Sequence, residues 1–200
     1  LTYLAELART HVFNFSNDPA PSVAGGDGAV FLHSYRGAIN QRCVVIVEDV
    51  AYILDQQGIH AVSGQGDQPL SGMIQDLFDP ESDYPYRINW TLSQFFHACH
   101  DPRQELLFWF VNLDCRKYPH FAIVFDYRSQ RWWIGEYSFP ICSSANAQIN
   151  GMPVVLLGST GRRVYALGHG FTDGADTDLL NTTGAVTASG LVSLTDASAA

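Results

Sequence analysis

One stretch in the middle of the chain holds the best metal-ligand residue types. His97 and Cys99 lie two residues apart, with His100 next to them and with Cys115 and His120 further along. Residues two apart on a β-strand share a face, so His97 and Cys99 could reach one zinc ion. The spacing matches no common zinc signature, and the apolar neighbours are typical of a packed sheet. We therefore favour a structural role, with zinc binding as the alternative.

A second candidate site is an acidic loop late in the sequence. Asp173, Asp176 and Asp178 surround Gly174, and carboxylate oxygens in a tight loop can bind calcium. The EF-hand pattern is not met, because no glutamate follows at the required distance. A solvated acidic turn is the favoured interpretation, and calcium binding is the alternative.

Trp132 and Trp133 are adjacent in a strand-like stretch. Consecutive side chains on a strand point to opposite faces. One ring can then bury roughly 150 to 250 Å² against a neighbouring sheet, while the other faces another sheet or a partner. Core packing is the favoured interpretation. Contact with a protein or a glycan is the alternative, so these two residues are the candidate interaction residues.

Motifs for nucleophilic catalysis and for phosphate binding are missing from the sequence. It has no G-x-S-x-G elbow, and its seven histidines form no recognisable local motif with a serine or a cysteine. The glycine-rich residues 25–28 are not a Walker sequence, and we expect them to form a flexible loop. We predict no enzymatic activity, no catalytic residues and no cofactor.

Composition narrows the class of protein. Two hundred residues with 46 % apolar and 12 % aromatic content suit one domain with a sizeable core. The net charge of −9 disfavours nucleic acid as a direct ligand. Apolar runs are far shorter than the roughly 20 residues that span a bilayer, so we expect no membrane insertion. The sequence shows no signal-peptide pattern, and we expect both of its ends to be incomplete.

The four cysteines are Cys43, Cys99, Cys115 and Cys142, and no two of them form a CxxC pair. So few cysteines do not make a disulfide-rich scaffold, and a reducing site of synthesis fits this usage. Unpaired cysteine behaves as a small hydrophobic residue. We therefore expect all four to be buried or half-buried free thiols.

Strands must carry the fold, because helix signals are sparse. A short amphipathic helical segment is expected only at Leu1, Leu4, Leu7 and Ala8. Elsewhere an apolar strand repeatedly runs into a polar turn and returns as a second apolar strand, which predicts a β-hairpin. The three clearest copies are residues 50–54 with 59–62, 121–125 with 131–134, and 154–157 with 163–167.

Two more strands, residues 94–100 and 105–113, precede the second hairpin. Four strands over about 45 residues match one propeller blade. Strand-like residues 30–35 and 42–47 precede the first hairpin and predict another blade, whereas residues 70–90 show no clean hairpin and are interpreted as an inter-blade excursion. The predicted fold class is all-β, a partial β-propeller of four-stranded antiparallel blades, with a β-sandwich as the alternative.

We divide the sequence into an N-terminal segment (residues 1–12), the propeller blades (residues 13–178) and a C-terminal segment leading out of the propeller (residues 179–200). A propeller closes with about four to eight blades, and this chain has room for three or four. The ring must then be completed by more of the polypeptide or by a second chain.

Five phrases of the sequence carry a family resemblance: residues 13–19, 53–64, 69–75, 124–132 and 161–173. In this order they resemble the propeller of bacteriophage structural proteins, including the tail-tube or nozzle proteins of short-tailed phages. The resemblance implies a subunit made in the host cytoplasm and located in the virion. It also implies other virion proteins as partners and a homo-oligomeric ring.

Two functions remain open on the sequence. The favoured one is a structural component of a bacteriophage virion, in the tail or at the head–tail junction, that assembles with other virion subunits. The alternative is a carbohydrate-binding or carbohydrate-cleaving β-propeller. Cleavage would require a converging pair of carboxylates in a central pocket, and the sequence does not place such a pair.

Overall fold

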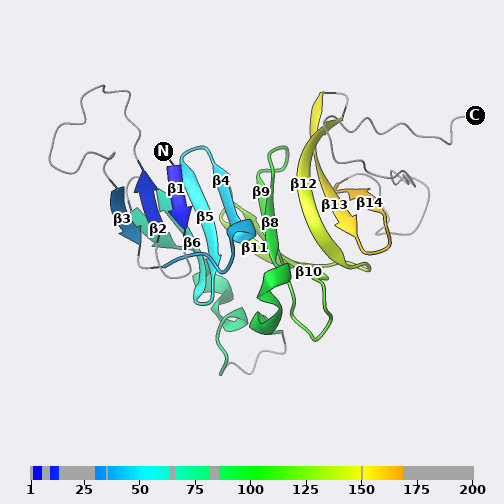
Figure 1. Ribbon diagram of the computed structural model, residues 1–200, viewed down its shortest axis with the longest axis horizontal. Helices are drawn as coiled ribbons and strands as arrows, with labels where there is room; N and C mark the ends of the chain where they lie inside the picture. Colours follow the sequence, from blue (N-terminus) through cyan, green and yellow to red (C-terminus); the bar gives the residue numbers. More distant parts are fainter. Residues whose placement is uncertain are drawn as a thin grey trace, which may run out of the picture.

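The computed structural model describes residues 2–5, 10–13, 30–34, 36–63, 66–81, 86–149 and 151–168; for those up to residue 34 it gives only the strands. Strands dominate this part of the chain and form four antiparallel sheets (Figure 1). Each sheet is a meander, in which strands that follow one another in sequence are neighbours. The predicted all-β class is therefore confirmed.

The elements follow one another in four groups. The first sheet contains β1 (Thr2–Ala5), β2 (Thr10–Phe13) and β3 (Val30–Ser34). The second contains β4 (Val44–Val47), β5 (Val50–Asp55), β6 (Gly58–Ser63) and β7 (Gly66–Pro69). The third contains β8 (His97–Asp101), β9 (Leu106–Val111), β10 (Phe121–Asp126) and β11 (Arg131–Glu136). The fourth contains β12 (Ile141–Ile149), β13 (Met152–Ser159) and β14 (Val164–Ala166).

Three short 3₁₀ helices lie in the connections of the described chain. They are η1 (Gln41–Cys43), η2 (Ser71–Leu77) and η3 (Trp90–Phe95). The interpretation of residues 70–90 as a connection without a hairpin is confirmed for the described part, since η2 and the start of η3 occupy it. Strand β8 begins later than predicted, because the Asn89 side chain accepts a hydrogen bond from the Thr91 N–H and starts η3 instead.

The three predicted hairpins are confirmed as β5–β6, β10–β11 and β13–β14, each antiparallel. An aspartate closes two of the turns. The Asp126 carboxylate accepts hydrogen bonds from the N–H groups of Arg128 and Ser129, at 2.9 and 2.8 Å, and Asp55 accepts one from Gln57 at 2.7 Å. Aspartate favours such turns because its short side chain bonds its own backbone two residues on.

Two sequence predictions were wrong at the N-terminal side. Residues 2–5 are strand β1, paired with β2, and do not form a helix, because pairing with the following strand overrides local propensity. Strand β3 pairs with β2 in the first sheet, so it is not part of the sheet that holds β5 and β6. That sheet is completed instead by β7, which pairs with β6 and lacks the apolar pattern of a strand.

The third sheet is the central layer of the described part. One of its faces packs on the second sheet through a cluster that we call the first core, and the other packs on the fourth sheet through the second core. The first core consists of Cys43, Val45, Leu54, Ile59, Leu77, Phe78, Ile88, Phe96, Leu107, Trp109, Val111, Leu113, Phe121, Ile123 and Phe125. The second core consists of Cys99, Leu106, Phe108, Phe110, Ala122, Val124, Ile141, Val155, Leu157 and Tyr165.

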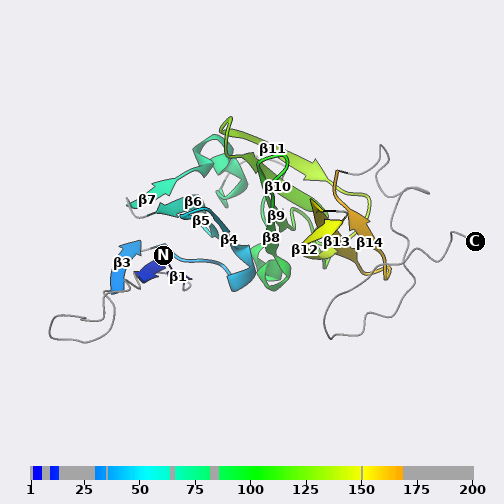
Figure 2. The same ribbon diagram turned by 90° about the horizontal axis from the view of Figure 1, so that it is seen from above.

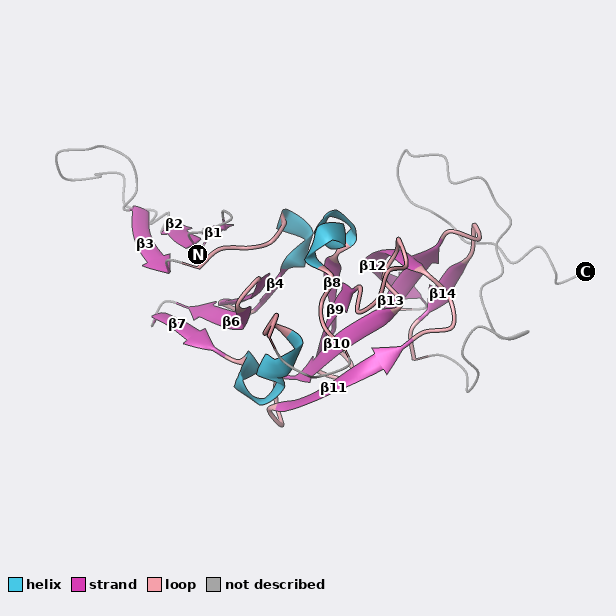
Figure 3. Ribbon diagram, turned by 90° about the horizontal axis from the view of Figure 1, so that it is seen from below, coloured by secondary structure: helices cyan, strands magenta, loops and turns pink. Residues whose placement is uncertain are grey.

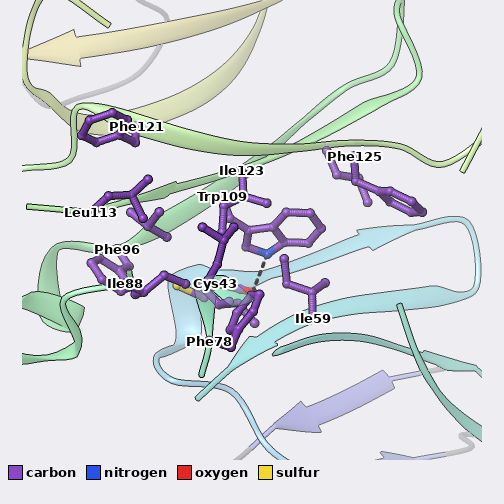
Figure 4. Close-up of a cluster of buried hydrophobic side chains, with 14 of the residues drawn as sticks. Cys43, Ile59, Phe78, Ile88, Phe96, Trp109, Leu113, Phe121, Ile123 and Phe125 are labelled. Atoms are coloured by element: carbon purple, nitrogen blue, oxygen red, sulfur yellow. Dashed lines mark hydrogen bonds between the residues drawn. The ribbon is translucent and has the colours of Figure 1, made fainter. Parts of the chain in front are cut away.

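Trp109 occupies the middle of the first core (Figure 4). Its side chain is fully buried, and its ring N–H donates a hydrogen bond of 3.3 Å to the carbonyl oxygen of Cys43. This bond joins β9 to η1 and so ties the third sheet to the start of the second. A buried indole N–H needs such a partner to offset its loss of water.

The first strands of the second, third and fourth sheets lie next to one another. Strand β8 neighbours both β4 and β12, and the three gather near the middle of the molecule in Figure 2. The later strands of each sheet spread outward from there, with β7 and β11 far from this centre in Figure 3. The second, third and fourth sheets therefore stack face to face.

The packing predicts different costs for two tryptophans of one sheet. Trp109→Ala should destabilise the protein by about 3–5 kcal/mol, because it empties a closely packed site. Trp133→Ala is the matched control and should cost about 1 kcal/mol or less, since that ring is 44 % exposed. Urea unfolding measures both values, and equal losses would contradict the layer order.

Candidate interaction surface

The His–Cys stretch is part of the second core. His97 and Cys99 both lie on the face of β8 toward the fourth sheet, so the predicted shared face is confirmed. The His97 ring stacks on Phe110 at 4.9 Å, and its Nδ1 lies 3.1 Å from the Phe95 carbonyl oxygen. Cys99 is paired across the ladder with Phe108. These contacts are those of a packed sheet interior.

The remaining candidate ligands lie elsewhere. His100 points to the opposite face of β8, where its Nε2 lies 3.2 Å from the Tyr127 hydroxyl. The Nδ1 of His120 lies 3.3 Å from the Tyr137 carbonyl oxygen. Within the described residues, no three His, Cys, Asp or Glu side chains come together as metal ligands. The zinc alternative thus finds no ligand set there.

Cys115 corrects the expectation that every cysteine is buried or half-buried. It is exposed in the loop between β9 and β10, whereas Cys43 and Cys99 are buried and Cys142 is half-buried. The Asp114 carboxylate accepts a hydrogen bond from the Arg116 N–H at 2.9 Å, which closes a tight turn and leaves Cys115 at its exposed apex. All four cysteines are free thiols.

Burial also decides the chemistry of the two inner thiols. Loss of solvent raises the pKa of Cys43 and of Cys99 to about 12, because the low-dielectric interior disfavours the thiolate. The thiolate is the form that attacks an electrophile or binds a metal. At neutral pH both residues therefore act as small apolar side chains.

Two other sequence candidates remain as predicted from the sequence. The acidic loop with Asp173, Asp176 and Asp178 lies outside the described residues, and so do the glycine-rich residues 25–28. Calcium binding by the acidic loop therefore stays an alternative to the solvated turn.

Trp132 and Trp133 point to opposite faces of β11, as predicted. Trp132 stacks on Phe125 at 4.2 Å and packs against the first core. Trp133 follows Cys99, Phe108 and Val124 in one row across the third sheet. Its three companions are at most 7 % exposed, but Trp133 itself is 44 % exposed. The row is covered at its inner end and uncovered at its outer end.

The structure contains a buried charged cluster that was not predicted from the sequence. Arg36 forms two hydrogen bonds of 2.8 Å with the Asp55 carboxylate, through Nε and Nη2. His60 is fully buried beside them, with its Nδ1 3.9 Å from Asp55. Burial lowers the pKa of His60, against the opposing pull of Asp67 and Asp55. The sequence feature that could have indicated this cluster is a histidine inside an otherwise apolar strand, next to an aspartate turn.

The β5–β6 turn at this cluster depends on a glycine. Gly58 has φ +145°, and a Cβ built there would lie 2.1 Å from the Ser71 hydroxyl oxygen. The same hydroxyl accepts a hydrogen bond of 3.1 Å from the Ile59 N–H. Only glycine leaves room for this approach, which joins the turn to η2.

The buried carboxylates have structural partners. Asp55 and Asp101 are the buried carboxylates of the described chain. Asp55 closes its turn and pairs with Arg36, and Asp101 accepts a hydrogen bond of 2.9 Å from the Arg103 N–H.

The chain matches no protein-family model, and it matches no curated protein at a significant level of similarity. Its residue roles can be taken only from its own sequence and structure. Among the described residues, no helix is long and apolar enough to cross a membrane. Trp133, at the exposed outer end of the third sheet, is one of five large apolar side chains that the described residues expose.

Acid should destabilise the fold through His97. Burial lowers its pKa to about 4, whereas the unfolded chain titrates near 6.5. Between these values the unfolded state binds a proton that the folded state does not, so stability is present above pH 6.5 and falls as the pH is lowered. The loss due to His97 should reach about 2–3 kcal/mol at pH 4.5.

Urea unfolding from pH 7.5 to 4.5 measures this loss, and His97→Phe, which keeps a ring against Phe110, should show a smaller one. An identical pH dependence in the two proteins would contradict the assignment to His97.

The Arg36–Asp55 pair should contribute more than a surface pair. Arg36→Ala leaves a nearly buried carboxylate without its partner and should cost about 2–3 kcal/mol. Arg128→Ala is the matched control, because Arg128 pairs with Glu105 at 3.0 Å while its side chain stays 78 % exposed. That loss should be at most about 1 kcal/mol. Thermal and urea unfolding would show the difference, and similar losses would argue against a structural role for the inner pair.

Proposed function

We propose that this chain is a β-propeller subunit of a bacteriophage virion, located in the tail or at the head–tail junction. It works by assembling with other virion proteins and with copies of itself in a ring. It is not an enzyme and takes no cofactor, and its surfaces are its functional parts.

The stacking of the sheets supports the propeller. A propeller is built from four-stranded meanders around a central axis, and each blade packs its faces on its neighbours. The second and third sheets have four strands each, and β4, β8 and β12 lie side by side at the inner end of their sheets. A two-sheet sandwich would bury one face of each sheet, whereas the third sheet here is buried on both.

One observation carries the assembly role, namely the outer face of the fourth sheet. Residues paired across strands share a face, and this face carries no charged side chain. Its apolar members are Ala145, Ala147, Ile149, Met152, Val154, Leu156, Val164 and Ala166. Neither core includes any of them. Val154 is buried, but Met152 is 52 % exposed and Ala145 is exposed as well. The exposed part of this apolar face is suited to contact with more of the polypeptide or with a partner subunit.

Charge fits a virion subunit as well. The chain has 20 acidic and 11 basic residues, so a phosphate backbone gains little by binding it. A ring of such subunits could surround DNA without holding it. The localisation that follows is the virion, after synthesis in the host cytoplasm.

The second candidate function is a carbohydrate-binding or carbohydrate-cleaving propeller. The exposed ring of Trp133 supports it, because an indole face can stack on a sugar. The structural roles of Asp55 and Asp101 weigh against cleavage. Glycan-array binding that is lost in Trp133→Ala would favour this candidate over the virion role.

The assembly role predicts that the chain does not persist as a monomer. Size-exclusion chromatography with light scattering should show an oligomer, or monomers that join one when tail components are added. Electron micrographs of the assembled protein should show rings, and peptides of the chain should be found by mass spectrometry in purified phage particles. A stable, soluble and fully folded monomer that joins nothing would contradict the proposal.

A further inference from the structure

Among the described residues, the fourth sheet has an open edge at β14. The second and third sheets have four strands each, but in the described chain the fourth ends at β14. The Ser159 N–H donates to the Arg163 carbonyl oxygen, and the Leu167 N–H donates to that of Val155. Backbone groups alternate in direction along an antiparallel strand, so those of Val164 and Ala166 point to the open edge. An edge of this kind can pair with another chain.

The two faces of β11 show what the open edge leaves uncovered. On the face toward the four-stranded second sheet, Trp132 and Ile134 pack against the first core. On the face toward the three-stranded fourth sheet, Trp133 packs with neither core. With β12 beside β8, a fourth strand next to β14 would lie opposite β11. The exposed ring of Trp133 and the open edge of β14 therefore lie at the same place in the stack of sheets.

Three arginines lie around this position, together with one aspartate, Asp126, which is paired across the ladder with Arg131. Arg162 and Arg163 precede β14, and Arg131 shares a face of β11 with Trp133. The arginines outnumber the aspartate. All three are exposed, and none forms an ion pair with a described side chain. A segment that combines carboxylates with aliphatic side chains would complement both the arginines and the indole ring.

We propose that the open edge of β14 binds an extended segment of a second copy of this chain, which completes the fourth sheet and covers Trp133. The inference rests on the self-assembly in the proposed function and names the contact that produces it. The chain itself carries a segment of the required chemistry in residues 173–180, where three aspartates precede Leu179 and Leu180. Backbone pairing supplies affinity in such strand addition, and the side chains supply register.

The contact joins two different surfaces. One copy offers the edge of β14, and the other offers its acidic segment. Such a heterologous contact repeats from copy to copy and closes a ring when the rotation allows it.

Self-association of edge variants tests the proposal. Ala166→Pro removes an outward N–H without touching the bonds to β13, Trp133→Ala removes the covered ring, and Arg162→Glu with Arg163→Glu reverses the charge. Sedimentation equilibrium should show self-association weakened at least tenfold in each. The matched controls are Ala166→Val, Met73→Ala and the pair Arg87→Glu with Lys117→Glu, which should associate like the parent chain.

Circular dichroism establishes that each variant folds. If Ala166→Pro does not fold, Trp133→Ala still tests the proposal. Parent-like association of folded Ala166→Pro and of Trp133→Ala would overturn the inference. That result would not contradict the proposed function, because the chain could then assemble through another surface. A parent chain that stays a folded monomer would overturn both.

Amide exchange followed by NMR identifies the occupant of the edge. The amides of Val164 and Ala166 should exchange slowly at high protein concentration and faster on dilution, whereas the inward amide of Leu167 should change less. Slow exchange that is independent of concentration would show that the chain covers its own edge, and fast exchange at every concentration would show an empty edge. Either result would overturn the inference.

Discussion

The structure depends on the burial of the third sheet on both faces. Every residue of β9, and all of β10 except its last residue, is buried, although consecutive side chains point in opposite directions. This is possible only because the second and fourth sheets cover the two faces. The result is a stack of sheets, in which each added sheet needs a neighbour for its own outer face.

Because the sheets are stacked, the exposure of residues in one sheet depends on the number of strands in the sheet that packs on it. Trp132 and Trp133 have the same side chain and adjacent positions, yet one packs into a core while the other is 44 % exposed. The difference follows from the strands opposite each ring. An exposed aromatic residue beside an open strand edge is suited to assembly. An added strand would form hydrogen bonds with the free backbone groups and would also cover the ring.

Polar residues inside the stack hold connections in place. Aspartates close the turns after β5, β8 and β10 by accepting backbone N–H bonds. Asp55 also pairs with Arg36, which comes from the segment before η1, and so fastens that segment to the β5–β6 hairpin. His97 and His60 are buried and have lowered pKa values, so both are neutral at physiological pH and add no charge to the interior. The fold is therefore stable with these two histidines near neutral pH and is destabilised by acid.

Local pattern was sufficient for much of the fold. Apolar runs that meet at aspartate- or glycine-containing turns predicted the hairpins β5–β6, β10–β11 and β13–β14, because a hairpin is formed by neighbours in sequence. Alternation on a strand likewise predicted that His97 and Cys99 share a face and that Trp132 and Trp133 do not. What the sequence could not decide was which tryptophan is covered, since this depends on sheets far away along the chain. For the same reason the membership of β3 and β7 in their sheets, the exposure of Cys115 and the joining of Arg36 to Asp55 were decided only by the tertiary structure.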